Sequence, residues 1–178
     1  MGAFPIGQAP KVRLLQSFLR TTVWLSDGGV AEIGAEARQA GRREVGGVLM
    51  GYITGMNVVV TDVIGPGPRA QLREDEFRPD SDWQSREIAR IYGESGRTTT
   101  YLGDWHTHPE SAPAPSPKDM MTAKRIARTK ESRVRRPVML ILGKKNDGQL
   151  ALAGYRYVRG RLRACTVKLY RATAIFGP

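Results

Sequence analysis

Hydrophobic residues recur along the chain with two different periods, and the order of these periods predicts a mixed α/β domain. Continuous or alternating apolar runs indicate strands, whereas apolar residues three and four positions apart indicate helices. The predicted order is strand, helix, two strands, helix, strand, helix and three strands. In residue numbers these elements are 23–25, 27–40, 44–53, 56–65, 80–94, 99–108, 117–130, 137–143, 150–158 and 162–169.

This order predicts one domain in which helices flank a mixed, curled β-sheet. A chain of 178 residues is long enough to bury a substantial core. We assign residues 1–22 to an N-terminal extension, in which apolar spacing at 11–20 predicts a short amphipathic segment. Residues 23–178 are assigned to the domain itself. The acidic segment 74–79 shows no hydrophobic periodicity from which an element can be predicted.

The two histidines of the chain lie two positions apart at the end of the predicted strand 99–108. Residues i and i+2 of a strand project from the same face about 7 Å apart. His106 and His108 are therefore close enough to share one metal ion. Pro109 ends the strand, Pro113 and Pro115 keep the chain irregular until Ser116, and Pro117 follows at the start of the next helix.

Ser116 and Asp119 have two readings. A Ser-x-x-acid pattern with proline at the second position is typical of a helix N-terminus closed by a capping box. Combined with the two histidines, however, Asp119 completes a set of two imidazoles and one carboxylate. Three such protein ligands leave zinc a fourth position, which is typical of catalytic rather than structural sites.

At this point the chain resembles a known family. His106-x-His108, seven further residues and Ser116-x-x-Asp119, with Glu44 upstream in Glu-Val-Gly-Gly-Val-Leu-Met-Gly, resemble the signature of JAMM metalloproteases. The Gly-Asp-Trp-His-Thr-His-Pro form looks most like the prokaryotic JAB branch. That branch includes the deconjugating peptidases of bacterial CBASS antiphage operons.

The resemblance covers residues 23–158 and implies a single MPN/JAB-like domain with a zinc ion (Zn2+) as cofactor. It implies that Glu44 acts as general base and that Ser116 hydrogen-bonds the developing oxyanion. A non-catalytic alternative is that Glu44 is a charged residue exposed to solvent at a strand edge. Gly46 and Gly47, which follow it, would let a neighbouring backbone or the substrate approach closely.

The activity implied is hydrolysis of the amide or isopeptide bond after the C-terminal tail of a protein modifier. The modifier would be a ubiquitin-like protein or a nucleotidyltransferase, with an E1- or E2-like conjugation enzyme as functional partner. Processing of a sulfur-carrier protein of ubiquitin-like fold is equally compatible with these residues. A metal-free MPN scaffold would have lost ligands that this chain retains, and a zinc deaminase would need more than the single Cys165.

Asp104 and Trp105, two neighbours of the histidines, are expected to lie on opposite faces of the predicted strand. Asp104 lies on the histidine face of the predicted strand and could orient an imidazole, although an exposed strand acid is an equal alternative. Trp105 faces the other side and is expected in the core. Cys165 is expected to be a buried or half-buried strand residue without catalytic function.

The formal net charge of +11 is the unusual bulk property of the chain. Many of the basic residues follow Asp119, and a basic stripe can bind nucleic acid. This one lacks interleaved aromatic residues, so we favour a solvated helix face that receives an acidic partner over a nucleic-acid site. Arg128, Arg133 and Arg135 are the residues expected to contact the substrate there.

The start of the chain shows no secretion signal, and the longest uncharged run, 45–60, is too short and too rich in glycine to span a membrane. A single cysteine cannot form an internal disulfide. We therefore expect a cytoplasmic protein with no membrane contact.

Overall fold

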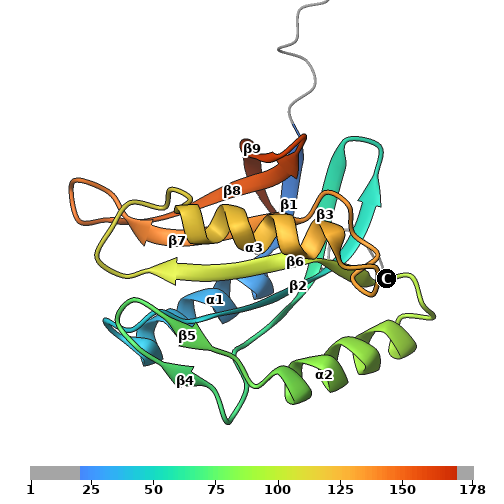
Figure 1. Ribbon diagram of the computed structural model, residues 1–178, viewed down its shortest axis with the longest axis horizontal. Coiled ribbons are helices and arrows are strands. Elements are labelled where there is room, and N and C mark those ends of the chain that lie inside the picture. Colours follow the sequence, from blue (N-terminus) through green and yellow to red (C-terminus); the bar gives the residue numbers. More distant parts are fainter. Residues whose placement is uncertain (1–20, 172–178) are drawn as a thin grey trace, which may run out of the picture.

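Seven strands form one continuous sheet in the computed structural model, which describes residues 21–171 (Figure 1). They are β1 (Thr22–Ser26), β2 (Gly46–Thr54), β3 (Asn57–Ile64), β6 (Thr100–His108), β7 (Val138–Lys144), β8 (Leu150–Val158) and β9 (Arg161–Tyr170). Their order is β1-β3-β2-β6-β7-β8-β9, and β1 also pairs with β9, so the sheet closes into a barrel.

Three helices pack on this sheet within the described part of the chain: α1 (Asp27–Ala40), α2 (Ser81–Glu94) and α3 (Pro117–Arg128). A small separate hairpin consists of β4 (Gln71–Leu72) and β5 (Phe77–Arg78). In Figure 1, α3 crosses the front of the sheet and α2 lies below β2. Trp83, Ile88 and Ile91 of α2 pack against residues of β2 and β3.

The prediction of a mixed, curled sheet flanked by helices is confirmed. β1 runs parallel to β3 and β9, and β6 runs parallel to β7, whereas the other neighbours are antiparallel. The sequence did not predict that the curl is complete, because pairing of the first and last strands is a long-range contact. It also did not predict the β4–β5 hairpin.

Local signals set the ends of α1 as the sequence predicted. The hydroxyl of Ser26 accepts a hydrogen bond from the Gly29 amide at 3.0 Å, which satisfies one of the free donors of the first turn. Gly41 follows the helix with a φ of 66°, and its amide donates to the carbonyl of Ala37. Glycine adopts this conformation without a steric penalty, so the chain can leave the helix and enter β2.

Apolar side chains form separate clusters on the two faces of the sheet. Inside the barrel, residues such as Leu49, Trp105 and Leu140 pack with Ile33 of α1. On the outer face, one cluster lies under α2 and another lies under α3 and includes Met139. Trp105 is thus in the core, as predicted, and the outward positions of β6 face the space between the two helices.

The predicted N-terminal amphipathic segment lies outside the described residues. Between residues 21 and 171, no helix combines the length and the apolar character needed to cross a bilayer.

Candidate metal centre

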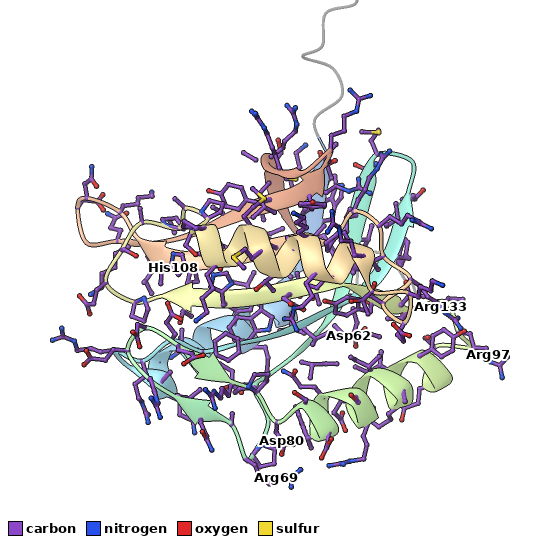
Figure 2. The ribbon with its side chains drawn as sticks, viewed as in Figure 1. Asp62, Arg69, Asp80, Arg97, His108 and Arg133 are labelled. Carbon is purple, nitrogen blue, oxygen red and sulfur yellow. The ribbon has the colours of Figure 1, made fainter. Side chains whose placement is uncertain are left out.

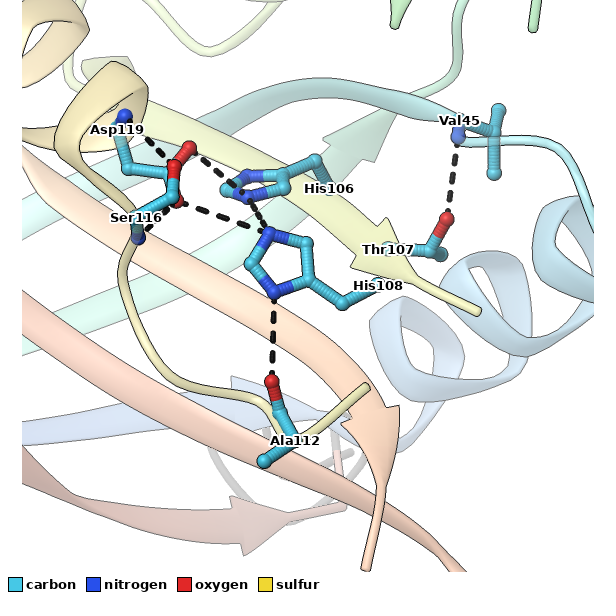
Figure 3. Close-up of polar contacts among 7 residues, drawn as sticks. All are labelled: Val45, His106, Thr107, His108, Ala112, Ser116 and Asp119. Atoms are coloured by element: carbon cyan, nitrogen blue, oxygen red, sulfur yellow. Dashed lines mark hydrogen bonds and ion pairs between the residues drawn. The ribbon is translucent and has the colours of Figure 1, made fainter. Parts of the chain in front are cut away.

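Two imidazoles and a carboxylate converge at the end of β6 (Figure 3). Nε2 of His106 lies 3.1 Å from Nε2 of His108 and 3.2 Å from Oδ1 of Asp119. Nε2 of His108 lies 3.6 Å from Oδ2 of Asp119. The potential ligand atoms of all three residues are within 4.8 Å of one another. The strand and the helix α3 therefore bring together the three residues that the sequence singled out.

The orientation of His108 leaves its inward nitrogen available as a ligand. Its Nδ1 lies 3.3 Å from the carbonyl oxygen of Ala112, which can only accept a hydrogen bond. Nδ1 therefore carries the proton in the neutral ring, and the lone pair lies on Nε2, beside His106 and Asp119. Such a carbonyl contact on the far nitrogen is the usual support for a metal-binding histidine.

Both readings of Ser116 and Asp119 hold at once. Ser116 caps α3, since its hydroxyl accepts from the Asp119 amide at 3.2 Å and Asp119 Oδ2 accepts from the Ser116 amide at 2.7 Å. The Ser116 hydroxyl also donates to Oδ2 at 2.7 Å. The capping box fixes the carboxylate in the first turn, where its second oxygen faces His106. Helix formation and the candidate ligand set therefore depend on the same side chain.

The environment keeps Asp119 ionised. Burial of the carboxyl opposes ionisation, but the hydrogen bond and charge of His106 and the hydrogen bonds from Ser116 outweigh it, and the pKa of Asp119 falls well below its usual range. A carboxylate that accepts several hydrogen bonds behaves in this way. Two nitrogen donors and an ionised oxygen donor, all nearly buried, form a set that suits a divalent cation and leaves room for a further ligand.

Glu44 faces the same cavity as the three potential ligands. The cavity has a volume of about 550 Å³, and Glu44, His106, His108, Ser116 and Asp119 are among the residues that line it. Burial raises the pKa of Glu44, although the nearby histidines act in the opposite direction. A carboxylate with a raised pKa is suited to accept a proton and release it again.

The backbone on both sides of Glu44 is fixed to other segments. Its amide donates to the carbonyl of Arg73 in the β4–β5 hairpin at 2.7 Å. The next residue, Val45, exchanges backbone bonds with β6, because its carbonyl accepts from the Thr107 amide and its amide donates to the Thr107 hydroxyl at 3.1 Å (Figure 3). Thr107, between the two histidines but on the opposite face, thus ties the strand of Glu44 to the ligand strand.

Gly46 and Gly47 allow close approach by the protein's own atoms. A side chain at Gly47 would collide with the carbonyl oxygen of Ile64, and one at Gly46 with the carbonyl oxygen of Trp105 and the ring of Phe77. The close approach of a neighbouring backbone, one of the two expectations, is therefore confirmed. It also places the Trp105 ring, whose Nε1 donates to Ile64 at 3.0 Å.

Asp104 is engaged by Tyr101 rather than by an imidazole. The Tyr101 hydroxyl donates to Asp104 Oδ1 at 2.6 Å. Burial raises the pKa of Asp104, against the hydrogen bond of Tyr101 and the charges of His106 and Arg125. The residue is half-buried and lines the cavity, and its side-chain hydrogen bond comes from Tyr101.

The prediction that the basic residues after Asp119 share one helix face is wrong for those beyond Arg128. α3 ends at Arg128, and Arg133 and Arg135 lie in the loop that follows. Figure 2 shows Arg133 near one end of α3 and His108 near the other. A helix of 12 residues spans ~18 Å, so these arginines are remote from the metal centre.

Side-chain contacts explain why the helix stops early. The hydroxyl of Ser132 donates to the carbonyl oxygens of Ile126 and Thr129, both at 2.8 Å. These bonds hold the chain in a turn that the helical ladder would exclude, and Arg133 follows with a φ of 55°. A run of basic residues gives no sign of such a turn in the sequence.

The sequence missed one wall of the cavity. Asp75, Glu76 and Phe77, from the β4–β5 hairpin and its turn, also line it. A hairpin with two-residue strands has no periodicity to detect, and its acidic turn is dominated by charge. The only available signal was the position of this segment between two confidently predicted elements.

The fold and site together define the class of this protein: a closed α/β barrel with a His-His-Asp candidate metal centre and an adjacent carboxylate. The chain belongs to the family of prokaryotic homologs of the JAB domain, whose model matches residues 27–153. The resemblance to the prokaryotic JAB branch is thereby confirmed.

Known proteins agree with this assignment. The chain is 36% identical over 159 residues to the probable metalloprotease y4qB of Sinorhizobium fredii, covering 84% of this chain and 97% of that protein. It is 38% identical over 106 residues to the CD-NTase/cGAS isopeptidase of Vibrio cholerae, covering 58% of this chain and 64% of that one. The solution structure of protein DSY2949 from Desulfitobacterium hafniense has the same fold, with a TM-score of 0.61 and 20% identity over 84% of this chain and 93% of that chain.

Proposed function

We propose that this chain is a zinc-dependent peptidase or isopeptidase that hydrolyses the bond following the C-terminal tail of a protein modifier. The observation that carries the proposal is the convergence of His106, His108 and Asp119 at a cavity that Glu44 also lines. The names of the relatives, a probable metalloprotease and isopeptidases, support the same class of reaction.

The donor set favours zinc among the common divalent ions. Two imidazole nitrogens and one carboxylate oxygen are typical of catalytic zinc, whereas magnesium and calcium prefer oxygen ligands alone. When bound, zinc acts as a Lewis acid that activates water and polarises a carbonyl group. The protein's own part is to hold the ion with three side chains, to manage the protons and to position the substrate.

Glu44 is proposed as the group that moves the proton. Its carboxylate accepts a proton from the attacking water and returns it to the departing amine. Burial, which raises its pKa, helps both halves of this task. The fixed backbone on either side, at Arg73 and Thr107, keeps the carboxylate on the cavity wall.

Ser116 is proposed as the donor to the developing oxyanion. Its hydroxyl has a single proton, which here is given to Asp119 at 2.7 Å. Stabilising the substrate oxygen therefore requires that the hydroxyl rotate about its Cβ–Oγ bond. The capping bond from the Asp119 amide uses an oxygen lone pair and is compatible with that rotation.

The substrate we propose is a flexible protein tail, because relatives are named for isopeptidase action on CD-NTase or cGAS-like proteins. The modifier would be such a nucleotidyltransferase or a ubiquitin-like protein, attached by an E1- or E2-like conjugation enzyme. An extended tail can reach a metal centre recessed between α2 and α3, whereas a folded loop fits a cavity of about 550 Å³ less well.

The test is to fuse candidate tails to an unrelated reporter and map the cut by mass spectrometry. The expected result is cleavage directly after the last residue of the tail, abolished by a chelator and restored by zinc. Cleavage that ignores the tail and follows the identity of the reporter would refute the substrate assignment. Full activity of a preparation shown by elemental analysis to be free of metal would refute the mechanism.

A further inference from the structure

Almost all of the net charge of this chain comes from one segment. Residues 133–171 contain eleven lysines and arginines but a single acidic residue, Asp147, so they carry +10 of the formal charge of +11. The remainder of the chain is close to neutral. This asymmetry makes the position of the basic side chains in the fold informative.

Several of these arginines meet at one end of the barrel. Arg156 of β8 lies directly opposite Arg163 of β9, so the two side chains share a face of the sheet. Arg161, two positions before Arg163, projects to the same side. Arg136 precedes the point where the Pro137 carbonyl accepts from the Tyr157 amide, beside the same pair of strands.

This face points toward the barrel interior. Leu152, Gly154 and Arg156 alternate along β8 on one side, and Leu152 packs in the core inside the barrel. The guanidinium of Arg156 is therefore turned inward near the end of the barrel, where its Nη1 donates to the hydroxyl of Thr21 at 3.2 Å. The residue is 7% exposed, while Arg136, Arg161 and Arg163 around it are exposed.

The arrangement is electrostatically unfavourable for the chain alone. Like charges directly opposite each other on paired strands repel, and a buried cation is costly unless it is paired. Nε of Arg156 has no hydrogen-bond partner within the described residues. No ion pair there involves any arginine of this end, and residues 1–20 and 172–178 contain no aspartate or glutamate. A counter-charge for the exposed arginines around Arg156 is thus expected from another molecule.

In two turns near this end, arginine has a positive φ, a backbone conformation that is unfavourable for residues with a side chain. Arg133 and Arg159 have φ values of 55° and 49°, and Arg159 is followed by Gly160 at 82° in the β8–β9 hairpin. Asparagine or glycine fits the first position of such a turn with less strain. Folding does not explain the choice of arginine at these positions, whereas a surface selected for positive charge does.

The arginine-lined end is distinct from the metal centre. β6 and β7 are parallel, with His108 beside Gly143 and Gly103 beside Val138, and their arrowheads point the same way in Figure 1. The arginines lie at the Val138 end and the ligands at the His108 end. Five residues of strand separate these ends by ~17 Å.

We propose that the arginine-lined end of the barrel, where Arg136, Arg161 and Arg163 are exposed around the buried Arg156, binds the phosphate backbone of nucleic acid. Charge is depleted at the centre of a typical protein interface, whereas this surface consists mainly of arginines. Of the exposed large hydrophobic residues, Ile53 and Met56 flank the β2–β3 turn, which lies at this end of the barrel because Asn57 pairs with Thr22, but none lies opposite the arginines of β8 and β9. Guanidinium groups match phosphate in a bidentate geometry.

Between residues 21 and 171 no aromatic side chain is exposed, which makes duplex backbone, rather than stacked single-stranded bases, the expected ligand. Recognition of phosphates alone is independent of base sequence and strongly dependent on salt. This binding does not depend on the proposed peptidase function, because it uses different residues and needs no hydrolysis.

The test is fluorescence anisotropy with a labelled DNA duplex of mixed sequence and about 20 base pairs, between about 50 and 200 mM salt. The full-length chain is compared with the triple variant Arg136→Gln, Arg161→Gln, Arg163→Gln. The matched control is Arg38→Gln, Arg86→Gln, Arg97→Gln, three exposed arginines of other regions that change the net charge equally. Arg156 is left in place because its replacement inside the barrel risks unfolding, and thermal melting checks all three proteins.

The expected result is salt-dependent binding by the wild type, weakened roughly tenfold or more in the test triple with a salt slope lower by about three. The control triple should bind nearly as the wild type does. Equal losses in the two triples, or no binding by the wild type at low salt, would overturn the proposal. Unchanged DNA binding together with a raised KM for a tail substrate would assign the surface to an acidic protein instead.

Discussion

The N-termini of α2 and α3 are both capped by a polar side chain, but the two caps have different consequences. Asp80 caps α2 by accepting from the Trp83 amide at 3.2 Å, and Ser116 with Asp119 caps α3. In both helices an aspartate near the start has a pKa below its ordinary value. Cap residues and acids at a helix start therefore do not by themselves distinguish a structural site from a functional one.

The partner of the carboxylate makes the difference. Both oxygens of Asp80 accept from the guanidinium of Arg69 at 2.9 Å, so its charge is neutralised by a cation built into the chain. Asp119 instead faces the imidazoles of His106 and His108, which can each offer a lone pair. One site is complete in itself, and the other has ligand atoms for an added cation.

Removing a candidate metal ligand should give the largest difference in effect between substitutions at the start of α3 and at the start of α2. Asp119→Ala or His108→Ala leaves two ligands, and we expect loss of bound metal and a fall in activity beyond the ~10⁴-fold upper range of general acid–base catalysis. Asp80→Ala should keep full metal content and activity but melt at a lower temperature. Elemental analysis and peptide hydrolysis measure these outcomes, and metal loss in Asp80→Ala would erase the distinction.

Replacing Glu44 tests whether this carboxylate transfers protons without binding the metal. Glu44→Gln should retain the metal and the melting temperature while turnover falls by roughly 10² to 10⁴-fold, since only proton transfer is removed. Metal content and kcat are measured on the same preparation. Loss of metal in this variant would show that Glu44 is a ligand and that the proposed division of roles is incorrect.

Ser116→Ala should affect stability and activity together, because the residue belongs to both the cap and the cavity. Loss of a cap costs about 0.5–2 kcal/mol, and loss of an oxyanion donor lowers kcat by about 10² to 10³-fold. Ser116→Thr, which keeps a hydroxyl, is the matched control and should retain most of both. If Ser116→Ala lowers stability but leaves kcat unchanged, the residue acts only as a cap.

The sequence predicted the long elements well because local signals set their ends. In the structure, Ser26, Asp80 and Ser116 cap the three helices and Gly41 follows α1, and all four are residue types typical of helix ends. Features that depend on distant residues were not predictable. These include the closure of the barrel by β1 and β9, and the β4–β5 hairpin, whose strands are too short to show a period.

The candidate site likewise has features that a local sequence pattern predicts and features that depend on distant residues. The spacing of His106, His108 and Asp119 along one strand and one helix start fixes their geometry, so a local pattern was sufficient. The bond from Glu44 to Arg73 and the bond from Tyr101 to Asp104 depend on the packing of an irregular segment and on side-chain conformation. The position of Arg133 outside the helix depends on the Ser132 hydroxyl, which no spacing rule detects.

The smallest expected effect is the acid dependence that Asp80 gives to stability. Its hydrogen bond from Arg69 is the main cause that lowers the pKa from 3.8 to about 2, so this carboxylate stabilises the fold above pH 4 and the contribution disappears as the pH falls toward 2. Asp80→Asn keeps a capping side chain but removes the charge. The difference in melting temperature between wild type and Asp80→Asn should therefore be constant above pH 4 and shrink below it.

The control is Arg69→Gln, which removes the cation beside Asp80 and should abolish the same pH dependence. A difference that persists unchanged at the lowest pH would mean that Asp80 titrates normally and that the α2 start is held by its cap alone.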